Sequence, residues 1–214
     1  MSRLIREKNL ISEINPKSTI SEVYRGLRTN IEFSNRGEAL KTIVFTSALP
    51  GEGKSTTSAN VAVAYAQTNR KVLLIDADLR TPVQHQLFEL SNHFGLSTAL
   101  TGHGELDEVI QKTNIDKLHV ITAGPIPSNP SELLESKAMT ALLEAMKELF
   151  DIIIIDTSSV MTVTDAQVVA SKSDGVVLVI KSGKVRNEMA LKAKSALEYG
   201  KATVIGAVLN GARR

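Results

Sequence analysis

The chain has 214 residues, of which 43% are hydrophobic and 22% charged, an ordinary balance for a soluble globular protein with one sizeable core. It contains no cysteine, which excludes disulfides and a zinc site built on thiolates. The net charge of +2 and the aromatic content of 4% give no support for a nucleic-acid partner. The first residues lack the apolar segment of a secretory signal, and no apolar run approaches the ~20 residues of a membrane span.

Before the first apolar run, Val23, Leu27 and Ile31 recur at helical spacing. This spacing predicts a helix within 17–33, with Ser18 or Ser21 as its N-cap. We expect this helix to lie outside the regular order of the elements that follow it.

Six short runs rich in Val and Ile are typical of strands that are buried on both faces. They are Thr42–Ser47, Val72–Ile75, Leu118–Ile121, Ile152–Ile155, Val176–Ile180 and Thr203–Leu209. Between them lie amphipathic stretches of helical length: Thr56–Gln67, Ser131–Phe150, Thr164–Lys172 and Val185–Tyr199. The alternation predicts a doubly wound, mostly parallel α/β sheet that forms one domain over residues 1–214. Ligands of such sheets bind at the carboxyl ends of the strands.

A Walker A loop follows the first predicted strand, although Ala48 stands where the motif has its first glycine. Gly51 and Gly53 allow the backbone N–H groups to curl around a phosphate chain. We expect Lys54 to reach the β- and γ-phosphates of ATP and the Ser55 hydroxyl to bind Mg²⁺. The alternative is a glycine-rich turn without a ligand. The predicted nucleotide-binding residues of the loop are Pro50, Gly51, Glu52, Gly53, Lys54, Ser55 and Thr56.

Carboxylates follow two more of the predicted strands. Asp76 and Asp78 come directly after the second run, where they could hold Mg²⁺ or accept a proton from an attacking hydroxyl. Alternatively, one of them caps the next helix. Arg80 could pair with a phosphate or with these carboxylates, in a catalytic or a structural role. Asp156 ends a run of four isoleucines, which is a Walker B pattern and predicts a metal ligand.

Two further polar features have less specific meanings. Asn210 ends the last predicted strand, where its amide could bind an adenine edge or could form a turn beside Gly211. The four histidines lack the spacing of a metal cluster, so we expect surface or turn positions for them. They are His85, His93, His103 and His119.

Taken together, these motifs resemble those of the bacterial tyrosine kinases, specifically the freestanding cytoplasmic type. The resemblance extends over nearly the whole chain. Its most specific parts are Glu22-Val-Tyr-Arg25-Gly-Leu-Arg28, which matches a helix motif E-x-x-R-x-x-R, and Asp76-Ala-Asp78-Leu-Arg80, which matches the Walker A′ segment. The stretches 124–134 and 162–166 also match.

The resemblance implies a protein-tyrosine kinase that controls capsular or exopolysaccharide synthesis. Its ATP–Mg²⁺ site would be formed by Lys54, Ser55, Asp76, Asp78 and Asp156, with Asp76 as the base toward a tyrosine hydroxyl. Glu22, Arg25 and Arg28 would make subunit contacts in a homo-oligomeric ring, although their spacing alone also fits a solvated helix face. A transmembrane activator of the polysaccharide co-polymerase type would recruit the cytoplasmic protein to the inner face of the membrane.

The sequence departs from the family pattern at two points. The family usually ends in a tyrosine cluster, but this sequence ends in Ala212-Arg213-Arg214, and Thr157-Ser158-Ser159 replaces Thr-Pro-Pro after Asp156. A nucleotide-binding regulator without autokinase activity is therefore a second hypothesis. A third is a partitioning-type ATPase, but Leu49 occupies the position of that class's second P-loop lysine.

Overall fold

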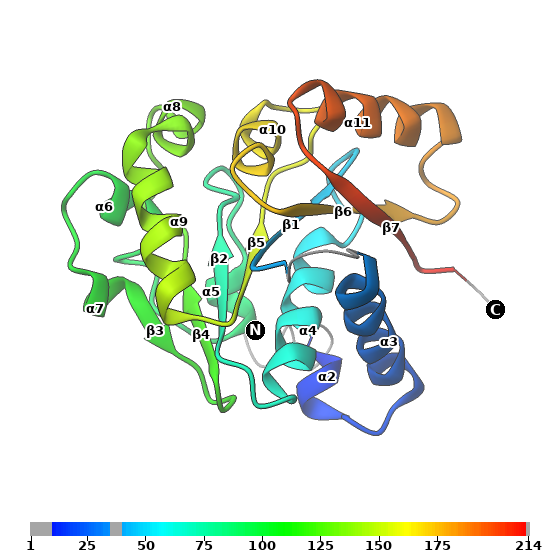
Figure 1. Cartoon of the computed structure of the whole chain (residues 1–214), viewed down its shortest axis with the longest axis horizontal. Helices are drawn as coiled ribbons and strands as arrows, with labels where there is room; N and C mark the ends of the chain where they lie inside the picture. The colour runs from blue at the N-terminus through cyan, green and yellow to red at the C-terminus, as the bar shows by residue number, and fades with distance from the viewer. Residues whose placement is uncertain (1–9, 35–39, 213–214) are drawn as a thin grey trace.

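The computed structural model describes residues 10–34 and 40–212, which form a seven-stranded sheet with helices on both faces (Figure 1). The strand order is β3-β4-β2-β5-β1-β6-β7, and every neighbouring pair is parallel except the antiparallel pair of β3 and β4. The strands are β1 (Thr42–Ser47), β2 (Val72–Asp76), β3 (Ile110–Lys112), β4 (Leu118–Ile121), β5 (Ile152–Asp156), β6 (Gly175–Lys181) and β7 (Val204–Asn210). The predicted fold class is confirmed.

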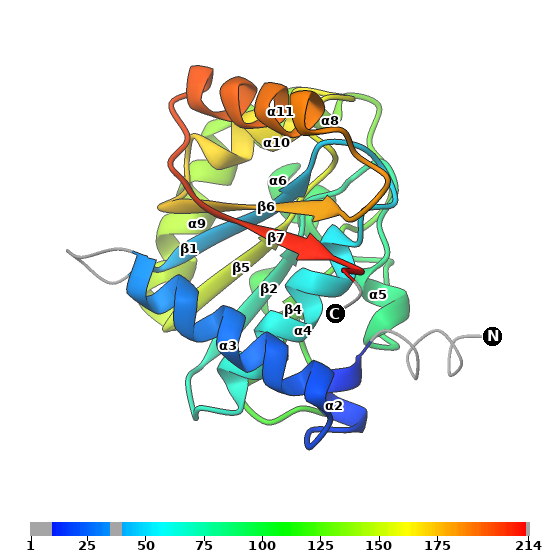
Figure 2. The same cartoon turned by 90° about the vertical axis from the view of Figure 1, so that its right-hand side faces the viewer.

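Two helical layers cover the sheet (Figure 2). One layer contains α6 (Leu96–Leu100), α8 (Pro130–Glu135), α9 (Lys137–Leu149), α10 (Asp165–Ala170) and α11 (Asn187–Tyr199). The other contains α2 (Ile11–Ile14), α3 (Thr19–Ser34), α4 (Lys54–Ala66) and α5 (Gln84–Leu87). The short α7 (Leu106–Val109) leads into β3. No helix in the described part of the chain is long and apolar enough to cross a membrane.

The N-terminal helix α3 packs mainly on α4 and also contacts the edge strand β7 (Figure 2). Ser18 caps it, because the Ser18 Oγ accepts a hydrogen bond from the Ser21 backbone N–H at 3.1 Å. With the sheet on one side and α3 on the other, α4 is buried from Thr57 to Ala66. The expectation of an amphipathic helix at 56–67 was therefore wrong, because a helix between two layers needs an apolar surface all round.

Two other predictions are corrected by the structure. The stretch 131–150 forms two helices, because Ser136 has an extended ψ of 158° and its Oγ caps α9 through the Met139 backbone N–H. The last strand, β7, is an edge strand and is only partly buried, although its sequence predicted a strand covered on both faces. Because an edge strand has a neighbouring strand on one side only, part of β7 stays exposed to solvent.

The Walker segments meet at one edge of the sheet. In the strand order, β2, β5, β1, β6 and β7 are consecutive, so their carboxyl ends lie side by side. The P-loop follows β1, the acidic residues end β2 and β5, and Asn210 ends β7. Parallel pairing therefore brings together side chains that are up to 160 positions apart in the sequence.

Candidate nucleotide-binding site

The loop between β1 and α4 has the backbone that its glycines predict. Gly51 and Gly53 have positive φ angles of 77° and 92°, and Gly53 directly precedes α4. A Cβ atom on Gly53 would lie 2.1 Å from the Asn210 Nδ2 atom. Position 53 therefore needs glycine both for its backbone conformation and for the close approach of the β7 end.

The side chains of Glu52 and Asn210 hold this loop in place through hydrogen bonds to backbone groups. Glu52 is completely buried, and its Oε atoms accept hydrogen bonds from the backbone N–H groups of Leu49 and, at 2.9 Å, of Lys181. Asn210 Nδ2 donates to the Glu52 carbonyl oxygen at 2.8 Å. Both side chains thus connect the loop to the ends of β6 and β7. Neither is among the described residues that line the cavity above the loop.

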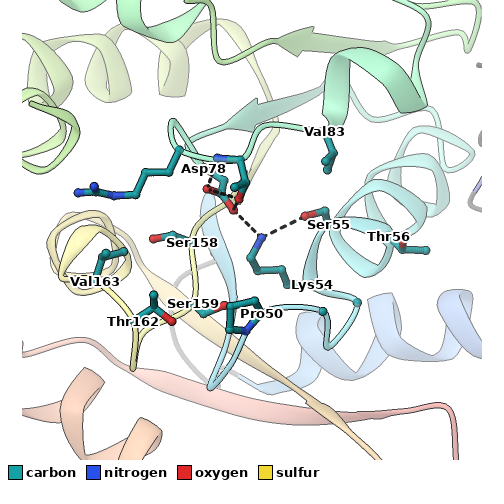
Figure 3. A pocket seen from close by; sticks show the side chains of 14 residues that line it. Pro50, Lys54, Ser55, Thr56, Asp78, Val83, Ser158, Ser159, Thr162 and Val163 are labelled. Atoms are coloured by element: carbon teal, nitrogen blue, oxygen red, sulfur yellow. Dashed lines mark hydrogen bonds and ion pairs between the residues drawn. The ribbon is translucent and has the colours of Figure 1, made fainter. Parts of the chain in front are cut away.

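That cavity has a volume of about 470 Å³. Figure 3 shows it between the P-loop, the segment after β2 and the segment after β5. Its lining includes the loop residues Pro50, Gly51, Gly53, Lys54, Ser55 and Thr56, together with Asp78 and Arg80 after β2 and Ser158 and Ser159 after β5. A cavity of this volume is large enough for a small phosphorylated ligand.

Lys54 and Asp78 form an ion pair inside the cavity (Figure 3). The Lys54 Nζ atom lies 2.7 Å from Asp78 Oδ2 and 3.3 Å from Ser55 Oγ. Burial acts to lower the pKa of Lys54, but the charges of Asp156 and Asp78 outweigh it and raise that pKa. The lysine is therefore a cation at neutral pH, available for exchange from a carboxylate to a phosphate.

Asp76 is the last residue of β2 and is completely buried. Its Oδ2 accepts hydrogen bonds from the backbone N–H groups of Val83 at 3.1 Å and Gln84 at 2.9 Å, and its Oδ1 accepts one from Asp78 at 3.2 Å. Burial raises the pKa of Asp76 well above the usual range, and the nearby Asp156 raises it further. The sequence left open whether Asp76 serves the metal and the substrate or caps the next helix. The structure shows its hydrogen bonds to the start of that helix, α5, and does not test the other role.

Asp156 has one buried oxygen without a partner. Its Oδ2 accepts a hydrogen bond from Gln84 Nε2 at 2.8 Å, whereas its Oδ1 has no hydrogen-bond partner among the described residues. Burial raises the pKa of this carboxyl, opposed by the Lys54 charge, by the nearby Ser55 hydroxyl and by the hydrogen bond from Gln84. A buried carboxylate oxygen without a partner is costly and fits a site that is completed by a ligand.

Gln84 is a component of the site that no sequence motif indicated. Its side chain is completely buried, and its Nε2 donates to the Ser55 carbonyl oxygen at 3.1 Å as well as to Asp156. Its backbone N–H donates to Asp76. One residue thus links the P-loop helix with the carboxylates at the ends of β2 and β5.

Arg80 pairs with neither of the carboxylates considered from the sequence. Its guanidinium group binds Asp165 of α10 through two hydrogen bonds of 2.8 and 3.1 Å, and it also donates to Ser131 Oγ at 3.1 Å. Asp165 is completely buried, whereas 40% of the Arg80 side chain is exposed. Arg80 also lines the cavity. It therefore connects α8 and α10 by hydrogen bonds and places a positive charge at the cavity surface.

The three residues of α3 that were predicted to make subunit contacts differ in their surroundings. Glu22 and Arg25 pair with each other on the exposed side, and Arg25 also donates to the Pro16 carbonyl oxygen. Arg28 instead points inward, and its Nη1 donates to the carbonyl oxygen of Ala64 in α4 at 3.0 Å. Only the first two are therefore free to contact another molecule without disturbing the packing of α3.

The histidines do not form a ligand cluster. Within residues 10–34 and 40–212, no three His, Cys, Asp or Glu side chains are grouped so that they could hold a metal ion by themselves. His93 and His103 are exposed, as expected, but His85 in α5 and His119 in β4 are half-buried. The His119 ring packs edge-on against Phe150 at a centroid distance of 5.4 Å, and burial lowers its pKa.

The sheet order and the loop geometry define a P-loop nucleotide-binding domain, and a family model described as an AAA domain matches residues 40–192. The tyrosine-protein kinase YwqD of Bacillus subtilis (strain 168) is 48% identical over 205 residues, which are 96% of this chain and 86% of YwqD. The structure of the chimerical protein CapA2B2 has 43% identity and a TM-score of 0.93, with coverage of 97% of this chain and 91% of that one. The kinase domain of the Escherichia coli tyrosine kinase ETK has 35% identity and a TM-score of 0.90, with coverage of 96% and 82%. The chain belongs to the bacterial tyrosine-kinase family.

Proposed function

We propose that this kinase transfers the γ-phosphoryl group of ATP to protein tyrosine hydroxyls with the help of Mg²⁺. The observation that carries the proposal is that, among the described residues, the buried Asp156 Oδ1 has no hydrogen-bond partner, while Lys54 in the cavity donates to Asp78 and Ser55. An incoming phosphate chain would take over the lysine and would accept hydrogen bonds from the loop N–H groups. The arrangement favours phosphate binding over a structural glycine turn.

The residues present fit a magnesium ion. Mg²⁺ is usually bound by one or two carboxylates together with waters and substrate phosphates, rather than by a cage of protein ligands. The Ser55 hydroxyl and Asp156 would hold it here, with Asp78 nearby on the cavity wall. When bound, the ion would neutralise charge that develops on the β- and γ-phosphate oxygens.

Two carboxylates after β2 are candidates to accept the tyrosine proton. Asp78 lines the cavity and can meet an incoming hydroxyl directly once Lys54 has moved to the phosphates. Asp76, which the family resemblance favours, has the raised pKa that suits a base, but both of its oxygens accept backbone hydrogen bonds. Because Asp76 is completely buried, a tyrosine hydroxyl would reach it only if the residues around it moved.

Lys54→Met tests the proposal. The neutral side chain cannot offset phosphate charge in the transition state, so phosphorylation of a glutamate–tyrosine copolymer should fall by at least ~10²-fold. Lys184→Met is the matched control: this lysine donates to the Pro50 carbonyl oxygen at 3.2 Å but does not line the cavity, and it should change the rate little. Near-wild-type turnover of the folded Lys54→Met variant would contradict the proposal.

We further propose that the kinase acts in capsular or exopolysaccharide synthesis and is recruited to the inner face of the membrane by a transmembrane activator. The family resemblance supports this proposal. If a cytosolic segment of such a partner raises ATP affinity, linkage requires ATP to tighten the binding of that segment by the same factor. Titration calorimetry of each ligand with and without the other measures both factors. If neither ligand changed the affinity of the other, the proposal would be contradicted.

A further inference from the structure

Ser158 lines the nucleotide-site cavity with a buried hydroxyl that has no partner within the chain. The residue is only 5% exposed, and its Oγ atom has no hydrogen-bond partner among residues 10–34 and 40–212. A serine hydroxyl is both a donor and an acceptor, and the large majority of buried hydroxyls in proteins are hydrogen-bonded. The Ser158 hydroxyl therefore fits a ligand that brings the missing partner into the cavity.

The backbone at Ser158 is held in place, so its side chain is the part that can adapt. The Ser158 carbonyl oxygen accepts hydrogen bonds from Thr46 Oγ1 at 2.7 Å and from Thr157 Oγ1 at 3.3 Å. Two residues further on, the Val160 backbone N–H donates to the Ser47 carbonyl oxygen at 2.9 Å, so the segment continues alongside β1. Rotation about the Cα–Cβ bond of the serine changes the direction of its hydroxyl without moving this backbone.

The position of Ser158 indicates which ligand group it meets. In the proposed function the P-loop and Lys54 hold the phosphate chain, so an acceptor hydroxyl must approach the γ-phosphorus in line with the leaving oxygen, from the side away from the loop. That side of the cavity is formed by the segments after β2 and β5, with Asp78, Arg80, Ser158, Thr162 and Val163. In Figure 3 the Ser158 side chain points away from Lys54 and toward the side where Val163 lies. Ser158 is thus placed on the acceptor side of the cavity.

We infer that the Ser158 hydroxyl binds the phenolic oxygen of the acceptor tyrosine and orients it toward the γ-phosphate of ATP. The inference rests on the proposed function. A phenolic oxygen has one proton and two lone pairs, so it can accept a hydrogen bond from Ser158 and attack the γ-phosphorus with its other lone pair. The bond from that phosphorus to the β–γ bridging oxygen breaks, and the phenolic proton passes to the carboxylate that acts as the base. Ser158 keeps its own proton throughout.

This contact requires serine at position 158. The family pattern has Thr-Pro-Pro where this chain has Thr157-Ser158-Ser159, and proline has no hydroxyl to offer. Ser159 is not equivalent to Ser158, because the Ser159 Oγ atom lies 3.2 Å from the Ser47 Oγ atom and is already hydrogen-bonded. The acceptor contact is therefore assigned to Ser158 alone of the two serines.

Ser158→Ala tests the inference with the glutamate–tyrosine copolymer as acceptor. The ratio kcat/KM for the copolymer should fall about 3- to 10-fold, the usual effect of one lost hydrogen bond between neutral groups. The KM for ATP and the Mg²⁺ concentration for half-maximal activity should keep their wild-type values, because the hydroxyl touches the acceptor. Thermal unfolding of the ligand-free variant should occur no earlier than that of wild type, because the hydroxyl has no partner in the described chain to lose.

Ser171→Ala is the matched control. It removes the same atoms at the exposed C-cap of α10, where the Ser171 hydroxyl donates to the Val168 carbonyl oxygen at 2.8 Å outside the cavity, and it should leave kcat/KM for the copolymer unchanged.

Each other outcome overturns the inference in a recognisable way. If Ser158→Ala keeps the wild-type kcat/KM for the copolymer, the inference is overturned and the kinase stands. A raised KM for ATP or a raised half-maximal Mg²⁺ concentration would place the hydroxyl at the nucleotide or the metal instead. Earlier unfolding of the ligand-free variant would show that the hydroxyl serves the fold. If wild type is inactive on the copolymer, the proposed function fails and the inference fails with it.

Discussion

Three buried carboxylates and one lysine face each other at the carboxyl ends of β2 and β5. Asp76, Asp78 and Asp156 are each at most 2% exposed, and Lys54 is the cation that counters them. Like charges in such a buried site repel each other, which makes the ligand-free protein less stable than a neutral core would be. A Mg²⁺–nucleotide complex would supply cations and hydrogen-bond acceptors at once, so we expect it to stabilise the fold strongly.

Gln84 should act as a positioning residue for Asp156. Gln84→Leu keeps the volume but removes the donor to Asp156 Oδ2, so the carboxylate loses its fixed orientation. Loss of such a supporting hydrogen bond at a metal site typically costs ~10–100-fold in metal affinity or activity. We therefore predict a higher Mg²⁺ concentration for half-maximal phosphorylation, measured by magnesium titration of the copolymer assay.

Gln86→Leu is the matched control for this prediction. It makes the same change two residues away on α5, where the side chain is exposed. If Gln84→Leu lowered the rate at saturating Mg²⁺ but left the half-maximal Mg²⁺ concentration unchanged, Gln84 would act on the fold of the site and not on the metal.

Among the single residues of the site, those that belong to a sequence motif were predicted, and those without a motif were missed. Lys54 and Ser55 lie where the Walker A spacing places them, and Asp156 ends its strand as predicted. Gln84 carries no motif, and the partner of Arg80 is 85 positions away in α10. Such contacts depend on how α5 and α10 pack against the strand ends, which local sequence does not encode.

Among the helices and strands, long elements were predictable and short ones were not. All six predicted strands exist, with ends that differ by one residue at most. The missed elements are the three-residue β3 and the helices α2, α5, α6 and α7 of four or five residues. A segment this short has too few residues to show a period, and its conformation is set by tertiary contacts.

The start of β1 is anchored by a side chain that gives a pH-dependent prediction. Asp174 precedes β6, and its Oδ2 accepts hydrogen bonds from the backbone N–H groups of Lys41 at 2.9 Å and Thr42 at 2.8 Å. Partial burial acts to raise the pKa of Asp174, but these donors outweigh it and lower that pKa. A carboxyl with a lowered pKa stabilises the fold above its unfolded pKa, and this contribution is lost as the pH falls through the folded pKa.

Asp174→Ala should therefore lower the free energy of unfolding at pH 7 by about 1 kcal/mol, a value reduced by the solvent exposure of the group. The difference from wild type should shrink below about pH 4, where the Asp174 carboxyl of the unfolded chain takes up a proton before that of the folded protein does. Urea titrations at several pH values measure it. Asp116→Ala, at an exposed aspartate, is the control. If the difference in the free energy of unfolding between wild type and Asp174→Ala grew toward low pH, this prediction would be wrong.

For the whole molecule, the outer face of α3 is the surface that suits contact with another copy. Ile20, Val23 and Phe33 of α3 are 56%, 55% and 78% exposed, and the same helix carries the Glu22–Arg25 pair. Exposed apolar residues beside charges are typical of interaction surfaces. We propose that this face makes the head-to-tail contact of the predicted ring, since such a contact closes when its rotation permits.

Glu22 and Arg25 can be tested without damage to the fold, whereas Arg28 cannot. Changing both Glu22 and Arg25 to Ala removes charges whose hydrogen bonds, within the described part of the chain, go to each other and to the Pro16 carbonyl oxygen. The change should shift the protein toward monomer. Arg28→Ala removes a hydrogen bond to Ala64 and should destabilise the packing of α3 on α4 by about 1 kcal/mol. A triple variant would mix these two effects, so the double variant is the informative one.

Light scattering during size-exclusion chromatography decides whether these charges make the contact. Wild type should have a larger mass than the Glu22/Arg25 double variant, and added salt should narrow the difference because exposed charges are screened over ~8–10 Å at ordinary ionic strength. Thermal unfolding of both proteins should coincide once they are monomeric, while Arg28→Ala should unfold earlier. If wild type is oligomeric and the double variant keeps the same mass at every salt concentration, Glu22 and Arg25 form a solvated face and the ring contact lies elsewhere.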